Sequence, residues 1–119
     1  MELTVEKRDG VHFISPHGEM VTGEGEQRFK DELNRASAGG ERRVIIDFTN
    51  VPYIDSSVLG QLVHGYTILK KDGGTLKLVN PSRRVMDLLK LTRLNTIFEI
   101  FDTREAAVSS WKRNSSKNS

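Results

Sequence analysis

The side chains that could carry catalysis are few, because the chain has three histidines and no cysteine. His12 and His17 lie five residues apart, which puts them on opposite faces of an extended strand. Ser57 and His64 could act as nucleophile and base, but their separation along one helix is about 10 Å, whereas hydrogen-bond reach is about 3 Å. The histidines also lack the clustered spacing of metal ligands. We therefore predict no nucleophilic site and no metal site.

Two carboxylates and a glycine-bearing stretch are the remaining candidates for chemistry. Asp47 lies in a run typical of a buried strand, and Asp55 stands where a helix N-cap is expected, so we predict no paired acid and base. Gly18, Gly23 and Gly25 are not followed by the Gly-Lys-Ser/Thr of a phosphate loop, and the acids among them would repel phosphate. We expect a protein that is not an enzyme and holds no cofactor.

The most informative segment is Asp55-Ser56-Ser57, between an apolar run and an amphipathic stretch. All three residues are helix-capping types, although one cap is enough to start a helix. A phosphate on Ser57 would meet free backbone N–H groups and the positive helix end, a local stabilisation of about 0.3–2 kcal/mol. Its charge would also disrupt an apolar surface docked there. These residues alone leave two interpretations open, simple capping and a reversible phosphorylation switch.

The elements that must position this segment follow from the hydrophobic periodicity. Residues 2–8 and 11–16 alternate around Asp9-Gly10, which is typical of a β-hairpin. Helical spacing and short apolar runs predict four helices and three further strands. The helices are expected over 24–38, 55–71, 85–91 and 104–111, and the strands over 44–48, 75–79 and 97–101. The second helix is expected to bury the stripe Leu59, Leu62, Val63, Tyr66 and Leu69.

The order ββαβαβαβα predicts the α/β fold class. Alternating strands and helices imply right-handed crossovers and a mixed, mostly parallel sheet, with the first strand antiparallel at an edge. The 119 residues suffice for one domain, which we place at residues 1–111. Residues 112–119 offer no core residue and are expected to form a disordered basic tail.

The composition excludes several classes of partner. Hydrophobic residues make up 36% and charged residues 29%, and the formal net charge is only +2, so we expect no nucleic-acid binding. No apolar run approaches the roughly 20 residues of a membrane span, and the amino end lacks the apolar stretch of a signal peptide. We expect a cytoplasmic protein without a membrane partner.

A resemblance to a known family is carried by two segments, VIIDFTNVPYIDSSVLG at 44–60 and KKDGGTLKLVN at 70–80. Together they resemble the STAS family of anti-sigma factor antagonists. The similarity extends over about residues 10–109 and includes Gly18-Glu19 near the start. It implies a single STAS-like domain that regulates sigma-factor-dependent transcription.

The resemblance also implies partners and site residues. Members of this type bind an anti-sigma factor that is also a serine kinase of the GHKL ATPase type, which frees the sigma factor. The kinase, which supplies the nucleotide and magnesium, phosphorylates the antagonist and the complex separates; a serine phosphatase resets the cycle. Ser57 matches the phosphorylated serine. Asp55, Ser56, Val58 and Glu19 fall with it at partner-binding positions.

One departure from the family pattern favours an alternative. Val58 stands where the family has glycine after the acceptor. We hypothesise that its isopropyl group lies beside the acceptor hydroxyl and slows phosphorylation, or requires an altered partner pocket. The alternative is a STAS scaffold or sensor subunit that is not phosphorylated, and a transporter-associated STAS domain is a further one. The sequence leaves the oligomeric state open between monomer and homodimer.

Overall fold

The computed structural model describes residues 2–117, with the surroundings of side chains described up to residue 112. The elements follow the predicted order, with one added 3-10 turn. The strands are β1 (Glu2–Arg8), β2 (Val11–His17), β3 (Arg43–Asp47), β4 (Thr75–Val79) and β5 (Glu99–Phe101). The helices are α1 (Glu24–Ala38), α2 (Ser56–Lys71), α3 (Arg83–Leu91), the 3-10 turn η1 (Leu94–Thr96) and α4 (Arg104–Lys117).

β1 and β2 form the predicted hairpin. Asp9 and Gly10 both have positive φ angles, 55° and 77°. A two-residue type I′ turn requires such angles at both positions, because its twist matches that of the flanking strands. Arg8 pairs with Val11 directly across the turn. The Asp-Gly dipeptide therefore sets the register of the whole hairpin.

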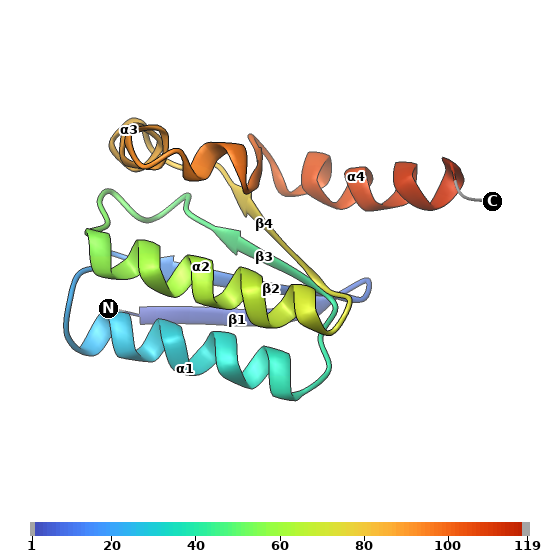
Figure 1. Ribbon diagram of the computed structural model, residues 1–119, viewed down its shortest axis with the longest axis horizontal. Coiled ribbons are helices and arrows are strands. Elements are labelled where there is room, and N and C mark those ends of the chain that lie inside the picture. The colour runs from blue at the N-terminus through green and yellow to red at the C-terminus, as the bar shows by residue number, and fades with distance from the viewer. Residues whose placement is uncertain (1, 118–119) are drawn as a thin grey trace.

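The five strands form one sheet in the order β1-β2-β3-β4-β5. β1 pairs with β2 in the antiparallel sense, and the other three pairings are parallel. The prediction of a mixed sheet with an antiparallel edge strand is confirmed. In Figure 1, α1 and α2 lie side by side in front of the sheet, while α4 packs against the opposite face.

Each face of the sheet has its own core. Val44 and Ile46 of β3 point toward α1, α2 and α3, where the larger hydrophobic cluster lies. Ile45, between them, points the other way and contacts Ala107 and Trp111 of α4. Because successive side chains of a strand alternate between faces, β3 is buried on both sides. Burial on both faces therefore explains the continuous apolar run of β3, as the sequence indicated.

The last strand is shorter than the sequence predicted. A strand was expected over 97–101, but β5 covers only Glu99–Phe101. Ile97 has helical backbone angles at the end of η1 and is 47% exposed. Phe98 is buried, with its ring centroid 5.4 Å from that of Tyr66 in an edge-to-face contact. Ile97 and Phe98 are apolar but lie outside β5, so the apolar run made the predicted strand too long. A short apolar run does not by itself distinguish a strand from a helical turn.

An arginine at the start of α4 fastens this helix to the sheet. Arg104 donates from Nε to Asp47 Oδ2 at 2.7 Å and from Nη1 to Glu6 Oε1 at 2.6 Å. It also donates from Nη2 to Ser15 Oγ at 2.7 Å. Burial acts to raise the pKa of Asp47, but hydrogen bonds from Thr49 and Arg104 outweigh it and lower that pKa. Asp47 therefore has a structural role at the base of α4.

A buried lysine holds α4 further along. The Lys77 Nζ lies 4.3 Å from the centre of the Trp111 ring, bonds to Ser110 Oγ and lies 3.5 Å from Glu99 Oε1. A cation on an indole face is a favourable contact when it is desolvated. The backbone of α4 continues to Lys117. The proposed limit of the domain at residue 111 stays a prediction, and the end of the predicted tail, 118–119, lies outside the described residues.

Candidate functional site

The segment singled out by the sequence lies where two loops meet at the carboxyl ends of β2 and β3. Met20, after β2, donates its N–H to the carbonyl of Tyr53 at 3.0 Å, and its carbonyl accepts from Asp55 N at 3.1 Å. Met20 and Ile54 form an isolated parallel bridge. These bonds extend the pairing beyond the strands. They place the β2–α1 loop, residues 18–23, directly beside the start of α2.

Asp55 is the N-cap of α2, as predicted. Its Oδ1 accepts from Ser57 N at 3.1 Å, from Ser57 Oγ at 2.5 Å and from Val58 N at 3.4 Å. Its Oδ2 accepts from the N–H and hydroxyl of Thr22, at 2.8 Å and 3.0 Å. One carboxylate therefore caps the helix and ties the neighbouring loop to it.

The hydrogen bonds keep this carboxylate ionised. The Ser57 hydroxyl, more than any other group, lowers the pKa of Asp55 to about 2, with burial opposing and the Thr22 donors assisting. Because the pKa of the folded state lies below the usual value of 3.8, the stabilisation is present above that value. It is lost as the pH falls toward 2. At neutral pH the site therefore carries a fixed negative charge.

Ser57 is half-buried, and its hydroxyl both donates and accepts a hydrogen bond. It donates to Asp55 Oδ1 and accepts from Thr22 Oγ1, which lies 3.0 Å from Ser57 Oγ. The preceding Ser56 and the predicted partner residue Glu19 are exposed. The structure thus brings four of the predicted residues, Asp55, Ser56, Ser57 and Glu19, to the surface of one end of the sheet.

The fifth predicted residue, Val58, does not lie there. Its side chain has 0% exposure and belongs to the larger core with Ile54 and Leu62. The expectation that its isopropyl group lies at the surface beside the acceptor hydroxyl is therefore wrong. Asp55 as N-cap makes Val58 the third residue of α2, and that position of the helix faces the sheet. A partner could therefore not contact Val58 directly.

Val58→Gly is accordingly expected to lower the free energy of unfolding by about 2–4 kcal/mol, through the lost side-chain burial, the cavity and the poorer helix propensity. Urea denaturation measures the change as a lower midpoint with an unchanged slope. Ser56→Gly is the matched control in the same helical turn, because Ser56 is exposed, and it should cost less than about 1 kcal/mol. Equal losses in the two variants would contradict the burial of Val58.

Thr22 is a site residue that the sequence analysis did not identify. It lies in a polar, glycine-bearing loop, and nothing in its local sequence distinguishes it from Thr49 or Thr67. Its role arises from the pairing of two loops 33 residues apart. The expected proximity of the two strand ends could have indicated the loop that contains Thr22, but not which residue of that loop contacts Asp55.

The excluded catalytic pairs are apart in the structure. His64 Nε2 lies 3.0 Å from Asn34 Oδ1 on α1, and Ser57 bonds to Asp55 and Thr22 instead. His12 contacts Glu32 of α1, whereas His17 contacts Thr4, whose strand partner Ser15 faces α4. The two histidines thus lie on opposite faces of the sheet, as predicted. Within the described residues, no three His, Cys, Asp or Glu side chains gather in a way that could hold a metal ion.

An apolar groove flanks the site. A cavity of about 290 Å³ lies between Tyr53 and the α3 residues Arg84, Asp87, Leu88 and Leu91. The guanidinium of Arg84 lies 4.4 Å from the centre of the Tyr53 ring. Leu91 is 81% exposed, an unusual environment for a leucine. Tyr53 belongs to the same loop as Asp55, so the groove and the capped helix start are neighbours along the chain.

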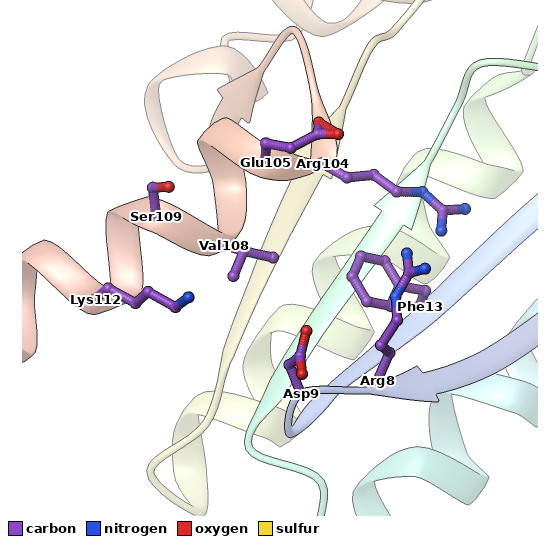
Figure 2. Close-up of a pocket in the computed structure, with 8 residues that line it drawn as sticks. All are labelled: Arg8, Asp9, Phe13, Arg104, Glu105, Val108, Ser109 and Lys112. Carbon is purple, nitrogen blue, oxygen red and sulfur yellow. The ribbon is translucent and has the colours of Figure 1, made fainter.

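A second groove lies on the opposite face of the sheet, between α4 and the hairpin. Figure 2 shows Arg8 and Arg104 approaching the ring of Phe13, with guanidinium carbons 5.5 Å and 4.7 Å from its centre. The cavity measures about 450 Å³. None of the predicted site residues lines it. Among the described residues, no helix combines the length and apolar character needed to cross a bilayer.

This fold and this site define a small α/β domain whose conspicuous feature is a hydroxyl-bearing surface at the start of α2. The model of the STAS domain matches residues 2–107. The chain belongs to the STAS domain family.

Similar proteins carry related names. A Bordetella bronchiseptica protein named "Putative anti-sigma factor antagonist BtrV" is 30% identical over 112 residues, 94% of this chain and 96% of its own length. The anti-sigma-B factor antagonist of Bacillus subtilis is 37% identical over 73 residues, 61% of this chain and 65% of its own. The crystal structure of a protein described as a "putative anti-sigma factor antagonist" from Thermotoga maritima has a TM-score of 0.85 and 28% identity. The match covers 91% of this chain and 92% of that protein's chain.

Proposed function

We propose that this protein is an anti-sigma factor antagonist that acts by binding and not by catalysis. Its partner is an anti-sigma factor that is also a serine kinase of the GHKL ATPase type. Phosphorylation of Ser57 ends the interaction, and a serine phosphatase restores it. The names of the relatives support the antagonist function. The observation that carries the switch is the half-buried Ser57 hydroxyl at the start of α2, beside an ionised carboxylate.

The position of Ser57 suits a reversible modification. The first N–H groups of a helix lack partners within the helix, and they favour anions such as phosphate. The folded state should therefore tolerate the phosphorylated serine. A partner docked over the same spot would instead meet up to two additional negative charges next to Asp55. The same modification is thus compatible with the fold and unfavourable for the complex.

The surroundings suit a protein partner. Val21 is 37% exposed in the adjoining loop, and the groove between Tyr53 and Leu91 offers apolar area near the same end of the sheet. Interfaces combine such apolar centres with a polar rim. Glu19, Ser56 and Ser57 would contribute to the polar rim. We propose that the anti-sigma factor covers this surface in the cytoplasm of the cell.

An alternative function, a STAS scaffold or sensor subunit that is not phosphorylated, is favoured by one observation. The Ser57 hydroxyl is held by both Asp55 and Thr22. Phosphorylation would require the hydroxyl to give up its bond to Asp55 as its proton leaves, and the bond from Thr22 restricts the direction from which the remaining lone pair can attack. The burial of Val58 removes the earlier argument for this alternative.

Mass spectrometry of the protein from its own cells separates the two functions. The protein is purified from growing and from stressed cultures, its intact mass is measured, and any phosphate is mapped by peptide fragmentation. We expect phosphate on Ser57, with an occupancy that differs between the cultures. The neighbouring Ser56 is an internal control for the mapping. Absence of phosphate from Ser57 in both cultures would favour the scaffold.

A further inference from the structure

The start of α1 depends on contacts from outside the helix. Gly23, its N-cap, has a φ of 122° and offers no side-chain hydrogen bond to the helix. The loop before it is held by backbone bonds as far as Met20. Beyond Met20, Thr22 supplies a tether two residues before α1 begins, through its two hydrogen bonds to Asp55. The first turn of α1 is therefore anchored to α2 at two points, through Thr22 to Asp55 and through Glu26, which accepts from the Gln61 side chain at 2.8 Å.

The same threonine contacts the proposed phosphorylation site. Its hydroxyl can donate to either of two acceptors, Asp55 Oδ2 and Ser57 Oγ, each 3.0 Å from Thr22 Oγ1. Four donors converge on this point: the N–H and hydroxyl of Thr22 and the N–H groups of Ser57 and Val58. In the unmodified protein these four and the Ser57 hydroxyl all bond to the Asp55 carboxylate, and the Thr22 hydroxyl lies equally close to Ser57 Oγ.

Phosphorylation changes this arrangement in a definite way. Transfer from ATP forms a bond between Ser57 Oγ and phosphorus, breaks the bond between phosphorus and the ADP oxygen and releases the hydroxyl proton. Ser57 then has no proton to donate to Asp55. The phosphate and the Asp55 carboxylate, both negative, compete for the same four donors. Phosphate oxygens are strong acceptors and attract such donors.

We propose that Thr22 relays the modification of Ser57 to the start of α1, because its two donors leave Asp55 for the phosphate. This inference rests on the proposed phosphorylation of Ser57. Thr22 acts here as a positioning residue. The partner surface then changes in two places at once, at the start of α2 and in the loop that carries Glu19 and Val21.

The test uses protein with phosphoserine genetically encoded at position 57, so that no kinase is needed. Amide hydrogen exchange over residues 21–26 is compared with that of the unmodified protein. We expect the exchange rate of the Thr22 amide to change by about 5-fold, the protection of one hydrogen bond, because its acceptor changes from Asp55 to the phosphate. The exchange of the amides at the start of α1 should change with it. Identical exchange in the two forms would overturn the relay.

A second readout isolates the threonine hydroxyl. The second pKa of the phosphate is measured by phosphorus NMR in three phosphorylated proteins: the parent, Thr22→Val and Thr22→Ser. Loss of a donor should raise this pKa by roughly 0.5–1 unit in Thr22→Val. Thr22→Ser keeps the hydroxyl and should match the parent. A phosphate pKa that is the same in all three, or an α1 response in Thr22→Val as large as in the parent, would contradict the proposal.

These measurements are independent of the mass spectrometry described above. If the cells never phosphorylate Ser57, the proposed function fails while the coupling between Ser57 and α1 can still be measured. If the cells do phosphorylate it and the amides of α1 do not respond, only the relay fails.

Discussion

Ser57→Asp is expected to weaken binding of the anti-sigma partner by about 30-fold to several thousand-fold. A charge left unpaired in an interface costs about 2–5 kcal/mol, and each 1.4 kcal/mol is a factor of ten in Kd. The new carboxylate would add a second negative charge beside the ionised Asp55. The partner is first captured with the parent protein and purified, and Kd values are then measured by titration calorimetry.

Two variants separate charge from shape. Ser57→Asn has nearly the volume of the aspartate variant without its charge, and it should bind within about 10-fold of the parent, since a neutral polar group costs less to bury than a charge. Ser57→Ala removes the acceptor oxygen and should bind persistently in the presence of ATP and the kinase. If Ser57→Asp binds as tightly as the parent, the switch is wrong. If Ser57→Asn loses as much affinity, shape and not charge controls the interface.

Much of the fold could be predicted because its signals are local. The Asp9-Gly10 turn, the cap at Asp55 and the apolar run of β3 each depend on a few consecutive residues. The mostly parallel sheet with an antiparallel edge strand then followed from general rules of connection. The errors arose where local pattern has two explanations, as at Ile97, where an apolar residue outside the sheet was assigned to the last strand.

The candidate site was only partly accessible to the same reasoning. Asp55 and Ser57 are adjacent in sequence, so their contact could be anticipated from capping alone. The contacts of Thr22 with Asp55 and of Arg104 with Asp47 join segments that are distant in sequence. No periodicity in the sequence indicates which threonine or arginine makes such a contact. The burial of Val58 could have been predicted from the helical spacing, but the predicted stripe began at Leu59 and left Val58 out.

The correct stripe follows from the geometry of α2. The buried residues of α2 recur at the spacing of one helical face: Val58, Leu59, Leu62, Gly65 and Leu69. The predicted burial of Leu59, Leu62 and Leu69 is confirmed. A Cβ at Gly65 would approach the Leu33 methyl groups to 3.0 Å, so glycine lets α1 and α2 pack closely. Val63, which was predicted to be buried, is 38% exposed. A helical face is therefore better defined when its small members are included.

Leu62→Ala is expected to lower the free energy of unfolding by about 2–5 kcal/mol, which is a large part of the 5–15 kcal/mol that holds a typical domain. Leu62 has 0% exposure in the larger core, on the stripe that joins α2 to the sheet, so its removal leaves a cavity that the surroundings fill only partly. Val63→Ala is the matched control one residue away. It should change stability by less than about 1 kcal/mol, since alanine is the better helix former.

The same pair tests whether stability and function have separate origins. Urea denaturation gives the loss in Leu62→Ala, and calorimetry at a temperature where the variant is still folded gives its affinity for the anti-sigma partner. Because Leu62 lies beneath the helix and Ser57 at its start, the folded fraction should bind with nearly the parent Kd. Ser57→Asp should show the reverse, near-parent stability with lost binding. A Leu62→Ala protein that is folded and still fails to bind would mean that the packing of α2 sets the geometry of the Asp55–Ser57–Thr22 network.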